Sequence, residues 1–205
     1  MAQTHTVSII QKLTVPLINN KKYQGLAYGA ALVRTNNDKR EFLNNFEKHL
    51  VTQELKEGPE KDFSYFIPDG NLFSFFGFYA GSKPEQELKE YLDENMKLKP
   101  HPVRRPTQTR NRVSWFFGYQ TPTIEEIYNN TPVHGDTSGS FKGSWVKLIE
   151  GGLDNFTYYI FDTFIKKSKS GTGLQAKNPV RSYGSFKGVP YITKLLKDFI
   201  KEIKD

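Results

Sequence analysis

The chain has few side chains that stand in a pattern typical of catalysis or metal binding. Its four histidines are His5, His49, His101 and His134. None lies in the H-E-x-x-H spacing that places two ligands on one helical face. Asp136 and Ser138 follow His134 closely, but catalytic triads are assembled from distant segments, so this closeness does not predict a triad.

Two glycine-rich segments are candidates for phosphate-binding loops. Residues 135–144 read GDTSGSFKGS and residues 170–174 read SGTGL. Neither matches G-x-x-x-x-G-K-[ST] or G-x-G-x-x-G, and neither follows a predicted strand and opens a long helix. We interpret both segments as turns.

Asp69 is the residue that a metal-dependent nuclease would need in this part of the chain. Such a site requires further carboxylates and a lysine in a short E-x-K arrangement, yet Gly81 stands two positions before Lys83. We therefore predict no catalytic, cofactor-binding or metal-binding residue and do not expect an enzyme. A nuclease is kept as the third hypothesis.

The composition narrows the class of protein. The 205 residues include no Cys, which removes disulfides, thiolate metal ligands and cysteine nucleophiles. No apolar run approaches the ~20 residues that span a bilayer, and the first residues do not resemble a signal peptide. We expect no membrane contact and synthesis in a cytoplasm. The net charge of +7 permits contact with nucleic acid or with an acidic partner.

The first third of the chain reads as mostly helical. Asn37 or Asp38 can cap a helix that ends at Gly58-Pro59, and residues 24–34 can also be helical. Ser82 and Glu85 form a capping-box pair at the start of a further helix. Between these helices, the aromatic run 71–79 predicts a buried strand or a buried hydrophobic arm.

A basic segment interrupts this pattern. Residues 97–112 read KLKPHPVRRPTQTRNR, with three prolines and no acidic residue, which predicts an extended linker. It divides the chain into a mostly helical region or arm (1–96), the linker (97–112) and an α+β core (113–205). The candidate DNA or partner contacts are Arg104, Arg105, Arg110 and Arg112 here, and Lys166, Lys167 and Lys169 in a later loop.

The last region predicts strands at 113–119, 145–149 and 157–161, a short helix at 121–130 and a C-terminal helix. That last helix carries an apolar stripe: Ile192, Leu195, Leu196, Phe199, Ile200 and Ile203. The expected fold class is α+β. A small antiparallel sheet packs with helices, including this amphipathic one, and extended arms reach outward.

One motif in this region resembles a known family. Thr131, Pro132, Val133, Gly139, Ser144 and Trp145 form a T-P…G…S-W turn, and Tyr158 and Tyr159 follow it in a predicted strand. The order of features resembles the head–tail connector and tail-completion proteins of tailed bacteriophages. The turn is longer than in that family, Phe161-Asp162 replaces its usual Glu-Gly, and the first ~110 residues have no counterpart in its shorter members.

The resemblance implies a structural virion protein, assembled in the host cytoplasm as a homo-oligomeric neck or tail-completion ring. Its partners would be copies of itself and portal, adaptor or tail proteins, with DNA passing non-specifically through the ring. It implies no cofactor. The alternative is a nucleic-acid-binding protein that uses residues 97–112 and nearby aromatic side chains. The runs 73–79 and 115–119 are candidate base-stacking platforms, although we expect them to lie in the core or at a subunit interface.

Overall fold

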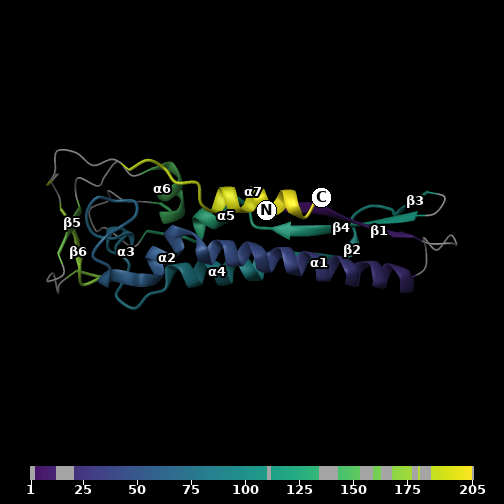
Figure 1. The fold of residues 1–205 in the computed structure, drawn as a ribbon, viewed down its shortest axis with the longest axis horizontal. Coiled ribbons are helices and arrows are strands. Elements are labelled where there is room, and N and C mark those ends of the chain that lie inside the picture. Colours follow the sequence, from purple (N-terminus) through teal and green to yellow (C-terminus); the bar gives the residue numbers. More distant parts are fainter. Residues whose placement is uncertain are drawn as a thin grey trace. The chain divides into compact units, whose positions relative to one another are not determined.

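The computed structural model describes residues 3–12, 21–109, 112–133, 143–152, 159–162, 168–176, 180 and 186–204 (Figure 1). The side chains of 10–12, 112 and 175 are not part of this description. The chain forms two compact units. Unit 1 comprises Met1–Asn44, Tyr91–Thr123 and Leu195–Asp205, and unit 2 comprises Asn45–Glu90 and Ile124–Lys194. Both units therefore draw on separate stretches, whereas the sequence suggested a division at 97–112.

Unit 1 is built on an antiparallel sheet. Strand β4 (Arg112–Thr121) lies between β1 (Gln3–Lys12) on one side and β2 (Lys97–Pro102) on the other, and β3 (Thr107–Thr109) also pairs with β4. Val7 pairs with Phe117 in the centre of the β1–β4 ladder. The pairing of β2 shifts between Leu98 and Pro102, where β2 has two more residues than β4.

The inner face of this sheet is aromatic because alternate residues of β4 point to the same side. Those side chains are Val113, Trp115, Phe117 and Tyr119, and each is buried. Phe117 meets Tyr28 of helix α1 (Lys21–Lys48) edge-on at 5.6 Å, and Tyr119 lies 5.4 Å from Phe199 of α7 (Ile192–Glu202). The inner face therefore forms the core of unit 1.

Unit 2 is a helical region with a two-stranded ladder. It contains α2 (Leu50–Glu57), a 3-10 turn (Gly58–Glu60), α3 (Leu72–Phe75), the start of α4 (Pro84–Asn95), α5 (Ile124–Asn129) and α6 (Trp145–Gly151). Strands β5 (Tyr159–Phe161) and β6 (Gly173–Gln175) pair antiparallel. Its largest buried side chains include Phe73, Phe75, Phe76, Phe78, Trp145, Tyr159 and Tyr191.

The α+β fold class is confirmed, and several predicted elements are present. The C-terminal helix buries Ile192, Leu196, Phe199 and Ile203 of the predicted stripe. Residues 24–34 are helical, and α2 ends at Gly58, which has φ 77°. The strand predicted at 113–119 is the middle of β4.

Other predicted elements were wrong. Residues 145–149 form helix α6 instead of a strand, because Ser144 caps the segment by accepting from the backbone N–H of Lys147. Most of the run 71–79 is buried as predicted, although Tyr79 at its end is exposed, and the run starts with the short helix α3, capped by Asn71. Asn37 and Asp38 lie inside α1 and do not cap a helix.

Two differences concern helix starts. Ser82 does not cap α4, since its hydroxyl donates to the carbonyl of Tyr79. Thr121 ends β4, and α5 begins at Ile124.

Residues 97–102 and 107–109 are extended as predicted, but they are paired strands of the sheet. In the described part of the chain, no helix combines the length and apolar character that a membrane crossing needs.

Candidate functional site

The motif that carries the family resemblance closes into one hydrogen-bonded structure in unit 2. The hydroxyls of Thr131 and Ser144, thirteen positions apart, lie 2.6 Å from each other. The backbone N–H of Trp145 donates to the carbonyl of Thr131 at 2.9 Å, and Val133 N–H donates to Gly143 at 2.9 Å. Pro132 and Ser144 form an isolated antiparallel bridge. The two ends of this long turn are therefore fixed together at its base.

Trp145 anchors the base of the turn in the aromatic core. Only 2% of Trp145 is exposed, and its ring lies 6.2 Å from both Phe78 and Tyr191. Ser144 bonds Thr131 at the base of the turn and also caps α6, so this one residue fixes both the turn and the start of the helix. The predicted motif residues Thr131, Pro132, Ser144 and Trp145 are thus brought together. Gly139 and the His134–Ser138 cluster lie outside the described residues.

A groove of about 240 Å³ lies beside the motif turn. Thr131, Pro132 and Trp145 line one part of it. The remaining lining residues are Phe78, Tyr79, Ser82, Pro84, Glu87 and Asn130. Pro132 and Tyr79 are exposed, so this groove has an apolar rim beside the motif.

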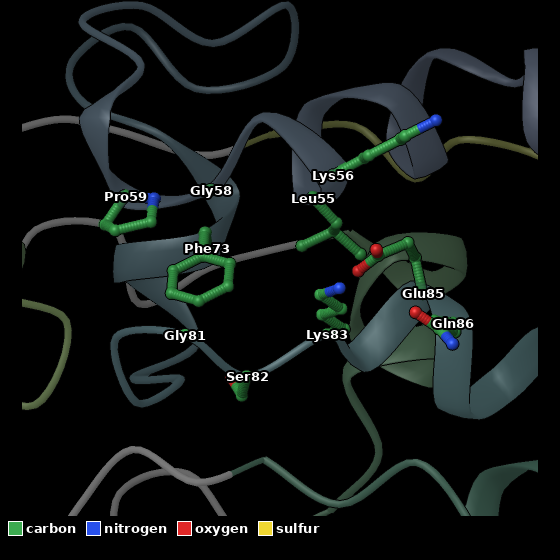
Figure 2. A pocket seen from close by; sticks show the side chains of 10 residues that line it. All are labelled: Leu55, Lys56, Gly58, Pro59, Phe73, Gly81, Ser82, Lys83, Glu85 and Gln86. Carbon is green, nitrogen blue, oxygen red and sulfur yellow. The ribbon is translucent and has the colours of Figure 1, made fainter.

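A second pocket in unit 2 has a volume of about 370 Å³ (Figure 2). It is lined by Leu55, Lys56, Gly58, Pro59, Phe73, Gly81, Ser82, Lys83, Glu85 and Gln86. Glu85 is 9% exposed, and its Oε2 has no hydrogen-bond partner among the described residues. Burial raises the pKa of Glu85, while backbone N–H groups of Glu85 and Gln86 and the charges of Lys83 and Lys56 oppose the rise.

This pocket holds charged groups but no activated nucleophile. The Ser82 hydroxyl on its wall donates to the Tyr79 carbonyl, and neither partner is a general base. In the described ranges no three His, Cys, Asp or Glu residues gather as a metal site. Asp69, the carboxylate considered for a nuclease, is exposed in the loop that precedes α3.

Two carboxylates of unit 2 hold loops together. Glu54 is fully buried, its Oε1 accepts from Leu72 N–H at 2.8 Å and its Oε2 accepts from Tyr65 N–H at 3.1 Å. Burial raises the pKa of Glu54, and hydrogen bonds from Ser64, Leu72 and Tyr65 oppose that rise, as does the charge of Lys61. Glu54 therefore fixes the loop 61–72 onto helix α2.

Glu150 joins the start of α7 to α5. Its Oε1 accepts from the backbone N–H of Thr193 at 2.6 Å, and its Oε2 accepts from the Thr193 hydroxyl at 2.7 Å. Tyr128 donates its hydroxyl to Oε2 at 2.9 Å. Burial, then the bond to Glu150, raises the pKa of Tyr128 to about 12. These bonds satisfy a helix N–H that would otherwise lack an acceptor.

In unit 1 the basic segment forms one edge of the sheet. Lys97 and Lys99 are exposed on β2, and Arg104 and Arg105 are exposed in the connection to β3. The guanidinium carbon of Arg104 lies 3.5 Å from the centre of the Phe116 ring. Of the other predicted basic contacts, Lys169 is exposed in unit 2. Arg110, Lys166, Lys167 and the side chain of Arg112 lie outside the described residues.

Apart from the exposed Tyr79, the aromatic side chains of the two runs are buried in the core and are not available to stack on bases. Phe73, Phe75, Phe76 and Phe78 are each no more than 1% exposed, as are Phe117 and Tyr119. Phe116 is 8% exposed beneath Arg104. Tyr159 is also buried, and Tyr158 lies outside the described residues.

Sequence reasoning notes the lack of acidic residues in 97–112 but misses that every strand of the unit 1 sheet lacks Asp and Glu. No Asp or Glu occurs in residues 1–37 or 95–124, which contain all four strands of unit 1. The signal was available in the sequence, but only the fold shows that the two stretches pair. Helix α4 is the opposite case, with Glu85, Glu87, Glu90, Asp93 and Glu94 against one lysine.

Comparisons with known proteins give no assignment for this chain. No model of a protein family matches it, and neither a curated protein nor a solved structure does.

Proposed function

We propose that this chain is a structural virion protein of a tailed bacteriophage. It would act as a neck or tail-completion subunit that forms a ring joining head and tail. The supporting observation is the closure of the motif turn, in which Thr131, Ser144 and Trp145 share hydrogen bonds. Residues that suggested the family by sequence thus belong to one local structure. Its partners would be further copies, portal, adaptor or tail proteins, and it would be assembled in the host cytoplasm.

A ring needs two different surfaces on each subunit that fit one another. The first half of α1 offers one: Leu26 is 55% exposed and Val33 64% exposed, on the same side of the helix. A Cβ atom on Gly25 or Gly29 would meet nothing within 4 Å, so this side of the helix is open to close approach. Lys21 and Lys22 add positive charge at its start.

The second surface is the exposed side of α4. Glu87, Glu90 and Glu94 are exposed and recur at the spacing of one helical face. Opposite charge on these two helices favours pairing between different copies and fixes their orientation. We therefore propose that the exposed side of the first half of α1 in one copy contacts the exposed side of α4 in the next copy.

The test is the mass in solution by light scattering, with negative-stain images of the same sample. The native chain should form rings or one discrete oligomer, alone or on a portal, adaptor or tail partner. The double variant Leu26→Glu/Val33→Glu should reduce this species by at least tenfold at equal concentration. Asn45→Glu/Gln53→Glu adds the same charge at exposed positions of unit 2 and should leave it intact.

Two results would overturn the proposal. A native chain that stays monomeric and binds none of these virion components cannot be a ring subunit. Equal loss of assembly in both double variants would remove the assigned α1 surface, because added charge alone would then explain the effect.

A further inference from the structure

We propose that the outer face of the unit 1 sheet binds the phosphate backbone of nucleic acid without reading its sequence. This face is the side of β1, β4 and β2 opposite the aromatic core of unit 1. The inference goes beyond the proposed function and does not depend on it, since binding to a phosphate backbone can be measured on the chain in any oligomeric state.

The first argument is charge. All four strands come from residues 1–37 and 95–124, which contain no Asp or Glu, so no strand residue can neutralise a cation on this face. Lys97, Lys99, Arg104 and Arg105 are exposed along its β2 edge. A cluster of cations without intervening carboxylates attracts a polyanion and repels other cations.

The second argument is the direction in which these side chains point. Leu98 pairs with Tyr119 and is buried with it, so Lys97 and Lys99 point to the opposite, outer face. They lie about 6.6 Å apart along the strand, since same-face neighbours are separated by two residues. Lys99 stays within 3.3 Å of the Thr4 hydroxyl on β1, which places its amine over the sheet.

Gly118 brings the arginines close to this face. A Cβ atom at Gly118 would lie 2.7 Å from Val103 and 2.8 Å from Thr4, so only glycine lets Val103 cross the strand here. Val103 N–H donates to the Phe116 carbonyl at 2.8 Å. Arg104 therefore stacks on Phe116, which orders its planar guanidinium while leaving the N–H groups at its edge for phosphate oxygens.

The outer face also carries hydroxyl groups and little apolar surface. Thr6 and Ser8 of β1 pair with Gly118 and Phe116, and Thr6 is exposed. Hydroxyls donate to phosphate oxygens and contribute nothing to burial in a bilayer. Among the described side chains of this face, Val103 is the large apolar one that is exposed, at 46%. A protein partner or a membrane would need a broader apolar centre than the described residues provide.

Base recognition is not expected here. Phe116 is covered by Arg104 and the other rings of β4 face the core, so the described side chains of the sheet offer no aromatic face for stacking. The expected binding is electrostatic and should weaken with salt. Four phosphate contacts with duplex DNA give a slope of about −3.6 in log K against log salt, or about 150-fold between 50 and 200 mM.

The experiment measures fluorescence anisotropy of labelled 20-nucleotide single-stranded and duplex DNA from 50 to 200 mM salt. The native chain should show the steep salt dependence. The quadruple variant Lys97→Gln/Lys99→Gln/Arg104→Gln/Arg105→Gln should lower the slope by about three to four and bind at least 50-fold more weakly at 50 mM. Lys48→Gln/Lys56→Gln/Lys187→Gln/Lys194→Gln removes the same charge from exposed positions in unit 2 and should change binding less than fivefold.

Two further variants separate folding from binding. Lys97→Gln/Lys99→Gln leaves the Arg104 stack in place and should lower the slope by about two. Arg104→Lys keeps the charge but not the planar stack, and should retain most of the binding. Circular dichroism confirms that each variant is folded.

Three outcomes would overturn the inference: no salt-dependent DNA binding by the native chain, equal loss in the sheet variant and the unit 2 control, or binding only to phosphatidylserine-containing vesicles. Loss of self-association instead of DNA binding in the sheet variant would also overturn it, by showing that this face contacts a second copy of the chain.

Discussion

The two units use their charged residues in different ways. In unit 2, Glu54 and Glu150 accept hydrogen bonds from backbone N–H groups and fix loops and helix ends. In unit 1, the strands carry no carboxylate at all, and the described strand lysines Lys97 and Lys99 remain exposed on one face of the sheet. The polar groups of unit 2 hold its own fold together, whereas the cations of the unit 1 sheet are available to a partner.

This difference separates stability from recognition. Removing a buried polar side chain destabilises the fold, because the groups that it bonded are left without a hydrogen-bond partner. An exposed cation contributes little to folding, since water solvates it equally well in the unfolded chain. Substitutions in unit 2 should therefore change the free energy of unfolding, and substitutions on the sheet should change binding alone.

The largest effect is expected for Glu54→Ala. The change leaves the N–H groups of Leu72 and Tyr65 without their acceptor and opens a small cavity beneath the loop 61–72. We expect a loss of about 3–5 kcal/mol in the free energy of unfolding, measured by urea denaturation. Glu60→Ala, at an exposed position of the 3-10 turn, should stay within about 0.5 kcal/mol. Equal effects of both substitutions would contradict the structural role of Glu54.

Glu150→Ala should have the next largest effect. It removes the acceptor of the Thr193 N–H and hydroxyl and of the Tyr128 hydroxyl. The expected loss is about 1.5–3 kcal/mol, with faster amide hydrogen exchange in the first turn of α7. Glu125→Ala, an exposed acidic residue of α5, provides the control. Unchanged exchange at Thr193 would show that the helix start does not depend on Glu150.

The elements predicted correctly from the sequence are those specified by local pattern. Helix α7 follows from its apolar stripe, and the end of α2 follows from Gly58-Pro59. Residues 145–149 were misread because a short apolar run is compatible with both a helix and a strand. The deciding signal was Ser144, a favourable cap that sits immediately before the run.

The sheet was harder to predict because its pairing is non-local. β1 pairs with β4 across more than one hundred residues, as in His5 with Tyr119. The alternation in Gln3–Lys12 is a strand signal, yet nothing local shows that its partner is β4. The basic stretch 97–112 looked like a linker for the same reason. The motif residues were found by resemblance, but their hydrogen bonds and the groove beside them required the fold.

A pH-dependent effect of intermediate size is expected at His49. Its Nδ1 accepts from Val51 N–H, and its Nε2 lies 3.2 Å from the Pro190 carbonyl, beside Tyr191. Burial lowers the pKa of His49, as does the charge of Lys194, while the bond to Pro190 opposes this. The unfolded chain, with a pKa near 6.5, therefore binds the proton first as the pH falls.

The stability that depends on neutral His49 is thus complete above pH 6.5 and is lost below it. Between pH 7.5 and 5.5 the contribution is at most about 1.4 kcal/mol. His49→Asn keeps a cap acceptor but does not titrate, so it should match the native chain at pH 7.5 and lose less stability at pH 5.5. Urea denaturation at both pH values measures the free energy of unfolding. If the His49→Asn variant lost as much stability at pH 5.5 as the native chain, His49 would be excluded as the source of the pH dependence.

The smallest effect on stability is expected on the sheet, where the same substitutions should weaken DNA binding. Lys97→Gln/Lys99→Gln removes two exposed cations whose surroundings contain no strand carboxylate, so no ion pair on the sheet is lost. The free energy of unfolding should change by less than about 0.5 kcal/mol, or rise slightly as repulsion between neighbouring cations is relieved. A loss of more than about 1 kcal/mol would mean that these lysines, like Glu54, hold the fold together. The contrast between the two units would then fail, and weaker DNA binding by the same variant could no longer be attributed to the lost phosphate contacts.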